Sequence, residues 1–128
     1  MKKTRNMAQW FKSASETIGG AWYYQGEPRT KAHQLLMRYG SEVITSGKEF
    51  ALVWHDEPIT KRALEKLYAD AEPGTLIAGN DYGYYEKTKV NKIVDAFAEQ
   101  HDISVHHNLS DPAIWWIHKE RSDESTDH

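Results

Sequence analysis

Two stretches of this chain share an uncommon order of residues, "FALVWHDEP" at 50–58 and "AIWWIHKER" at 113–121. Each is an apolar run that contains a tryptophan, reaches a histidine and has a glutamate two residues after that histidine. Successive side chains of a β-strand point to opposite faces, so both runs are apolar on both faces. His55 and His118 close the same edge of one face, and we expect both runs to be strands.

The residues that precede these runs also match in order. An aromatic strand, an amphipathic helix, a short strand and a turn come before each run, at an offset that grows from 61 residues at Tyr23 and Tyr84 to 63 at the two histidines. The pattern indicates two β-α-β-β units, unless the likeness is a coincidence. A second interpretation takes residues 18–80 as a ferredoxin-like unit with a helix and hairpin appended at the C-terminal side.

Helices are marked by apolar residues on one face. Pro28 suits the first turn of one helix and Gly40 the position just past its end. Similar stripes predict helices over residues 63–71 and 88–101. A further short helix is predicted near the N-terminus from the stripe Met7, Trp10, Phe11 and Ala14.

Turn residues suggest that neighbouring strands form hairpins. Ser46 and Gly47 lie between the strand at 43–44 and the run at 50–54, and a second hairpin is expected to turn at 109–112. The fold class predicted is therefore α+β, a mostly antiparallel sheet with helices packed on it. Residues 1–120 are expected to form one domain, and residues 121–128 a disordered acidic tail.

Composition excludes several classes of protein. The chain has no cysteine, which rules out a disulfide framework and a thiolate metal site. Its net charge of −3 argues against general phosphate binding. We find no apolar run near the ~18 residues that a membrane span needs. The predicted location is the cytoplasm, with no membrane association.

The histidines give no metal site from sequence alone. His106 and His107 are neighbours in a strand, so their rings point to opposite faces. If His107 pairs with Ala113, then His106 lies opposite Ile114, and His118 is on the order of 13 Å further along. That separation is too large for shared ligation. We therefore predict no metal and no cofactor.

The segment "HDEP" is the densest cluster of titratable residues. His55 beside Asp56 could serve as a general base. Asp56 could equally cap the helix that follows, where a carboxylate accepts free N–H groups. The enzyme alternative is a small metal-independent hydrolase or lyase, with the candidate catalytic residues His55, Asp56, His118 and Tyr85.

A nucleic-acid-binding module is a second alternative. The last helix and hairpin could form a winged helix, with Lys87, Lys89 and Lys92 near phosphate. Asp95 and Glu99 follow on the same helix and oppose that role. Nucleic acid is therefore an unlikely partner.

The favoured function is non-catalytic binding through an aromatic sheet face, as in inhibitors, immunity proteins or mobile-element accessory proteins. Helices on one side of a sheet would leave Trp116 at the centre of an uncovered apolar patch. The predicted partner is a second copy in a homodimer, with another protein or a small molecule as alternatives. The candidate binding residues are Trp116, Ile114, His118, His106, Tyr84 and Tyr24.

Overall fold

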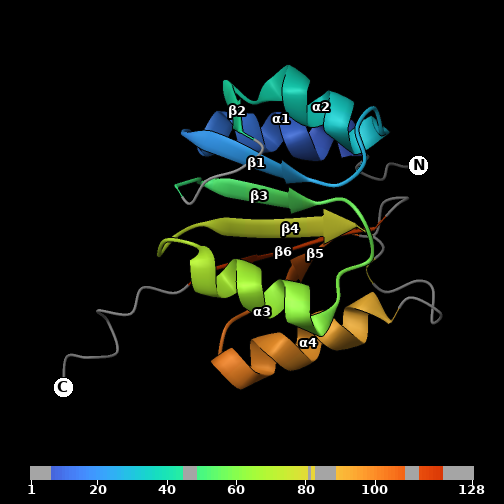
Figure 1. Cartoon of the computed structure of the whole chain (residues 1–128), viewed down its shortest axis with the longest axis vertical. Helices are drawn as coiled ribbons and strands as arrows, with labels where there is room; N and C mark the ends of the chain where they lie inside the picture. The colour runs from blue at the N-terminus through green and yellow to red at the C-terminus, as the bar shows by residue number, and fades with distance from the viewer. Residues whose placement is uncertain (1–6, 45–48, 81, 83–88, 109–112, 120–128) are drawn as a thin grey trace.

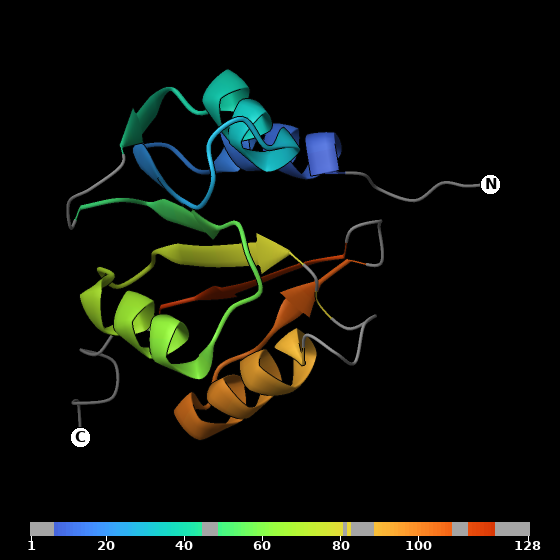
Figure 2. The ribbon, with the colours of Figure 1, turned by 45° about the vertical axis from the view of Figure 1, so that its right-hand side comes forward.

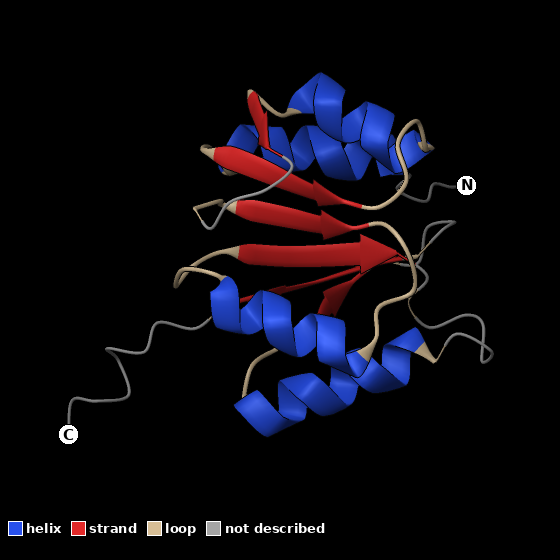
Figure 3. Cartoon of the chain, viewed as in Figure 1, coloured by secondary structure: helices blue, strands red, loops and turns tan. Residues whose placement is uncertain are grey.

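A single mixed sheet organises the chain in the computed structural model, which describes residues 7–44, 49–80, 82, 89–108 and 113–119 (Figures 1 and 3). The helices are α1 (Met7–Thr17), α2 (Lys31–Tyr39), α3 (Lys61–Asp70) and α4 (Val90–His101). The strands are β1 (Ala21–Gln25), β2 (Glu42–Ile44), β3 (Leu52–His55), β4 (Leu76–Asn80), β5 (His106–His107) and β6 (Ile114–His118).

The sheet has six strands in the order β2-β1-β3-β4-β6-β5. The first four in this order are parallel to one another, and β6 is antiparallel to both β4 and β5. The prediction of a mostly antiparallel sheet is therefore wrong, and so is the ferredoxin-like alternative. Apolar alternation identifies strands and their faces, but it does not encode the direction in which neighbouring strands run.

Helices cover both faces of this sheet (Figures 1 and 2). The helices α1 and α2 pack on one face around the buried Trp22 and Trp54. The helices α3 and α4 pack on the other face around Val53, Ile77 and Trp115. Each face thus buries its own apolar cluster, and the chain is a three-layer α/β structure.

Local signals in the sequence placed the helices well. The stripe of Met7, Trp10, Phe11 and Ala14 is the buried face of α1. Thr30 caps α2 by accepting the main-chain N–H of His33, and the N–H of Gly40 returns to the carbonyl of Leu36. The alternation within strands is also confirmed: Leu52 and Trp54 face α1 and α2, while Val53 faces α3 and α4.

The predicted hairpin between β2 and β3 does not exist. Both strands pair with β1, on its two sides, and all three are parallel. Residues 45–51 alone separate β2 from β3 in the sequence, whereas parallel strands are usually joined by about a dozen residues or more. Phe50, at the end of that connection, packs its ring 5.1 Å from the ring of Tyr23.

The predicted internal duplication is also wrong. α2 and α4, the two helices that should match, lie on opposite faces of the sheet (Figure 2). β3 is a parallel strand, whereas β6 is antiparallel to both of its neighbours. The likeness between "FALVWHDEP" and "AIWWIHKER" is therefore a likeness of strand pattern alone.

The register of the last hairpin differs from the predicted one. His106 pairs with Trp116 and His107 with Trp115, so the turn is longer than expected. As a result the rings of His106 and His118 lie 5.9 Å apart, centroid to centroid, and not on the order of 13 Å apart as the predicted register implied. Within the described ranges, no helix is long and apolar enough to cross a membrane. The predicted acidic tail lies outside the described residues.

Candidate functional site

Polar side chains gather where three parallel strands end. β1 ends at Gln25, β3 at His55 and β4 at Asn80, and the parallel pairing brings these ends to one edge of the sheet. From β1 the chain moves outward to β2, and from β3 it moves in the opposite direction to β4. The order of strands thus reverses between β1 and β3, and ligands of open α/β sheets bind in the crevice at such a point.

The carboxylate of Asp56 lies at the centre of this edge. It accepts hydrogen bonds from four side chains: the Tyr24 hydroxyl at 2.7 Å, the Thr30 hydroxyl, the Trp54 indole N–H at 3.0 Å and the Asn80 amide at 3.1 Å. These donors come from β1, the N-cap of α2, β3 and β4. Asp56 therefore ties four elements together. It is not the cap of α3, because Thr60 accepts the main-chain N–H of Ala63 there.

Tyr24 is a protonated member of this network. Burial raises the pKa of the Tyr24 hydroxyl well above its usual value, and the neighbouring Asp56 raises the pKa further. The hydroxyl therefore keeps its proton and stays a donor. The network supports the site's shape, and it leaves Asp56 little capacity to act as a base.

The pKa of His55 is shifted in the opposite direction from that of Tyr24. Its Nδ1 lies 2.9 Å from Oε1 of Gln25, whose amide nitrogen in turn donates to the Tyr23 hydroxyl at 3.2 Å. An amide oxygen can only accept, so Nδ1 of His55 holds the proton. Burial lowers the pKa of His55, although the nearby Glu57 and Asp56 favour the charged form. Neutral His55 therefore keeps a lone pair on Nε2.

A cavity of about 600 Å³ opens beside His55, on the face of the sheet that α3 covers. Its walls include the rings of Tyr23 and Phe50 and the side chain of Leu67. Its polar lining includes Gln25, His55, Glu57, Lys66 and Asp70. Lys66 donates to Asp70 at 3.2 Å, while Glu57 is exposed. The cavity thus combines aromatic walls with a neutral imidazole and a carboxylate.

Two further features mark the same edge. Oδ1 of Asn80 is buried and has no hydrogen-bond partner among the described residues. Such an atom is costly to leave unpaired, so it is a candidate acceptor for a ligand. Gly26 has φ +147°, and a Cβ there would lie 2.7 Å from Cβ of Asp56. The loop after β1 therefore packs directly on the Asp56 network, and only glycine fits.

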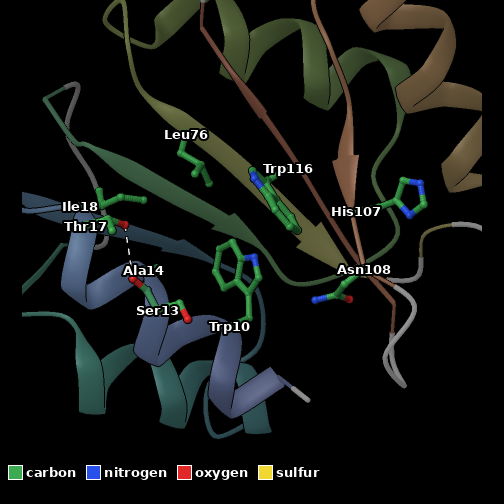
Figure 4. A pocket seen from close by; sticks show the side chains of 9 residues that line it. All are labelled: Trp10, Ser13, Ala14, Thr17, Ile18, Leu76, His107, Asn108 and Trp116. Atoms are coloured by element: carbon green, nitrogen blue, oxygen red, sulfur yellow. Dashed lines mark hydrogen bonds between the residues drawn. The ribbon is translucent and has the colours of Figure 1, made fainter. Parts of the chain in front are cut away.

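A second cavity of about 410 Å³ lies between α1 and the sheet (Figure 4). Trp10 and Trp116 pack against each other in its lining, with ring centroids 5.7 Å apart, and His107 points away (Figure 4). Ser13 and Thr17 supply its few polar groups on the helix side. This cavity is mostly apolar, and the described residues bring no titratable pair into it.

The structure separates the predicted catalytic residues. His55 and Asp56 are together at the carboxyl edge of the sheet. His118 pairs with Leu76, the first residue of β4, so it lies toward the opposite edge. Tyr85 lies outside the described residues. Of the predicted catalytic residues, the structure therefore brings together His55 and Asp56 and places His118 elsewhere.

The predicted binding residues are also divided. His106 and His118 are exposed on the face that α1 covers, and Trp116 is half-buried between them and α1. Ile114 is fully buried in the core and cannot contact a partner. Tyr24 is buried in the Asp56 network, and Tyr84 lies outside the described residues.

Sequence reasoning missed Gln25, Thr30 and Asn80. Each is an ordinary polar residue at the end of a strand or the start of a helix. The signal that could have found them is the parallel direction of β1, β3 and β4, because parallel strands bring their carboxyl ends together. Without that direction, the three residues share no pattern.

No protein-family model matches the chain, and no curated protein matches it in sequence. Solved structures do match. A Klebsiella pneumoniae protein assigned as an O-methyltransferase has a TM-score of 0.57 at 10% identity, over 94% of this chain and 82% of its own. A Streptococcus mutans protein assigned as a methyltransferase, solved with S-adenosylhomocysteine (SAH), has a TM-score of 0.56 at 12% identity, over 93% and 99%.

The N-methyltransferase NodS of Bradyrhizobium japonicum has a TM-score of 0.51 at 8% identity, over 89% of this chain and 93% of its own. These neighbours are enzymes that match nearly the whole chain. They overturn the prediction of a non-catalytic protein-binding function of the inhibitor, immunity or accessory kind. At such low identities the likeness speaks for architecture, and the chain has the Rossmann-like fold of these methyltransferases.

Proposed function

We propose that this chain is an S-adenosylmethionine-dependent methyltransferase that acts on a small molecule. The observation that carries the proposal is the cavity of about 600 Å³ at the β1/β3 switch point, beside Gln25 and His55. That is the place where the strand order predicts a ligand. A cytoplasmic location stays part of the proposal.

The residues present fit such a cofactor in chemical terms. S-adenosylmethionine supplies a methyl group from a positively charged sulfonium, and it carries an adenine ring and several N–H and O–H donors. The aromatic walls from Tyr23 and Phe50 suit a flat ring or a cation. The Glu57 carboxylate, which lines the cavity, suits positive charge.

The loop after β1 departs from the dinucleotide-binding pattern, since it holds Gly26 alone where that pattern has three glycines. The pattern's glycines allow the backbone to approach a pyrophosphate. S-adenosylmethionine has no pyrophosphate, so this departure argues against a dinucleotide and does not argue against the proposed cofactor.

We assign to His55 the role of the base that accepts the proton from the methyl acceptor. When a hydroxyl or amine acceptor gains a methyl group, its O–H or N–H bond breaks and the proton needs a base. Nε2 of neutral His55 has the lone pair for that proton, and Gln25 holds the ring in the required tautomer. The lowered pKa keeps His55 neutral near pH 7, which suits a general base.

Calorimetric titration with SAH tests the cofactor site. The unmodified protein should bind SAH, and Gln25→Ala should weaken binding about tenfold, or about 1.4 kcal/mol. Gln34→Ala is the matched control, because this exposed glutamine of α2 also loses one hydrogen bond, to the carbonyl of Arg29.

Absence of SAH binding at millimolar concentration would overturn the proposal, and so would equal weakening by Gln34→Ala. The role of His55 is tested separately. His55→Ala should leave SAH affinity within about threefold, while transfer of radiolabelled methyl to a mixture of small hydroxyl and amine compounds should disappear.

A further inference from the structure

His106 and His118 form a pair that the predicted register had separated. They lie on adjacent antiparallel strands, with His106 opposite Trp116 and His118 two residues further along β6. Residues two apart in a strand share a face, so both imidazoles point to the side of the sheet that α1 covers. Their ring centroids are 5.9 Å apart, and the rings meet at 78°.

This separation suits a shared metal ion. An ion bound about 2.0–2.1 Å from a ring nitrogen lies roughly 3.2 Å from the ring centroid, so two rings that share it have centroids within roughly 6.5 Å. The observed 5.9 Å falls inside that limit. Both side chains are exposed, so an ion and its water ligands can reach them.

Trp116 helps to hold this arrangement. Its ring stacks on His106, with centroids 5.7 Å apart and the planes at 20°, and it also packs on Trp10 of α1, with centroids 5.7 Å apart. Trp116 is thus fixed between the helix and the histidine pair. An indole in this position limits the rotation of His106, which reduces the conformational entropy that metal binding costs.

We propose that His106 and His118 together bind one divalent transition-metal ion, with Cu²⁺ preferred to Zn²⁺. Imidazole ligands suit both ions, and sites of this type bind Cu²⁺ more tightly. Among the described residues no cluster of three or more metal-ligating side chains exists, so the described part of the chain supplies two ligands to the ion. The pair lies on β5 and β6, away from Gln25 and His55, and does not depend on the proposed methyltransferase.

The test is a Cu²⁺ titration of the full chain, followed by calorimetry and by tryptophan fluorescence. One equivalent should bind and quench part of the emission, because Trp116 touches His106. His106→Ala and His118→Ala should each weaken this event at least tenfold. Copper bound at the chain termini contributes equally to every variant, so the difference between variants reports the pair.

His107→Ala is the matched control. His107 neighbours His106 in β5, but it stacks on Tyr82 at 4.6 Å and belongs to the opposite face. Trp116→Phe should keep the calorimetric binding and lose most of the quenching. The proposal is overturned if His107→Ala weakens binding as much as His106→Ala, or if the double His106→Gln, His118→Gln variant, folded by circular dichroism, binds Cu²⁺ as the parent does.

Discussion

β3 and β6 come from stretches that share a residue pattern, yet they place their histidines in opposite environments. His55 closes a parallel strand at the carboxyl edge, where it is 9% exposed and bonded to Gln25. His118 closes an antiparallel strand toward the other edge and is exposed. The same residue pattern thus yields a buried neutral imidazole in one strand and an exposed ring in the other. The direction of each strand, which is set by the neighbouring strands, decides the environment of its histidine.

The residue after each histidine makes the contrast sharper. Asp56 follows His55 and gathers four donors from separate elements. Lys119 follows His118, and its ammonium donates to the main-chain carbonyl of Tyr68. The same ammonium lies 4.5 Å from the centroid of the Tyr68 ring. The carboxyl edge around Asp56 therefore carries a side-chain network centred on one carboxylate, while Lys119 at the other end of the sheet contacts Tyr68.

The largest expected effect is on this network. Asp56→Ala would leave the donors of Trp54 and Asn80 without their acceptor, and buried unpaired donors are costly. We expect the free energy of unfolding to fall by at least about 3 kcal/mol in urea denaturation. Asp70→Ala, which breaks an exposed pair with Lys66, should cost about 0.5 kcal/mol. A loss near 1 kcal/mol for Asp56→Ala would match a simple helix cap and contradict the network.

The second prediction concerns the loop after β1, where Gly26 packs on Asp56. Gly26→Ala and Gly74→Ala both force a side chain onto positive φ, but only at Gly26 would the new Cβ meet other atoms, 2.7 Å from Cβ of Asp56. Both variants carry backbone strain, and Gly26→Ala adds a clash of about 1–3 kcal/mol. Thermal denaturation of the two proteins should show this difference. Equal melting temperatures would contradict close packing of Gly26 against Asp56.

The third prediction concerns the pH dependence of stability that arises from His55. Burial lowers the pKa of folded His55, so below about pH 6.5 the unfolded chain binds a proton that the folded chain does not. The free energy of unfolding should therefore fall as pH drops from about 6.5 to the lowered folded pKa. His55→Gln should flatten this slope. A slope that survives in His55→Gln would assign the effect to another group.

The helices could be predicted because their signals are local. Met7, Trp10 and Phe11 mark the buried face of α1, and Gly40 marks the end of α2. The sheet could not be predicted, because Ser46 and Gly47 suggest a hairpin, whereas β1 lies between β2 and β3. Strand order is a property of contacts between distant residues, and single-sequence patterns do not contain it.

The same reason explains what was and was not foreseen at the site. His55 and Asp56 stood out because they are adjacent titratable residues in one segment. Gln25 and Asn80 did not, since they become neighbours of His55 and Asp56 only through the parallel pairing of β1, β3 and β4. A correct strand order would have found both residues.

The last prediction, with the smallest effect on folding, concerns self-association. The homodimer expected from the sequence stays a prediction, and the contact it needs would include Trp116, which is half-buried between Trp10 and His106. Trp116→Glu puts a charge on that surface, where a two-fold contact would bring it against its own copy. Sedimentation in the presence of EDTA, which removes any metal bridge, should shift from dimer to monomer while circular dichroism stays unchanged.

His107→Ala, on the opposite face of the same hairpin, should leave the mass unchanged. A monomeric parent protein would rule out the dimer, and unfolding of Trp116→Glu would show that Trp116 serves the core through Trp10.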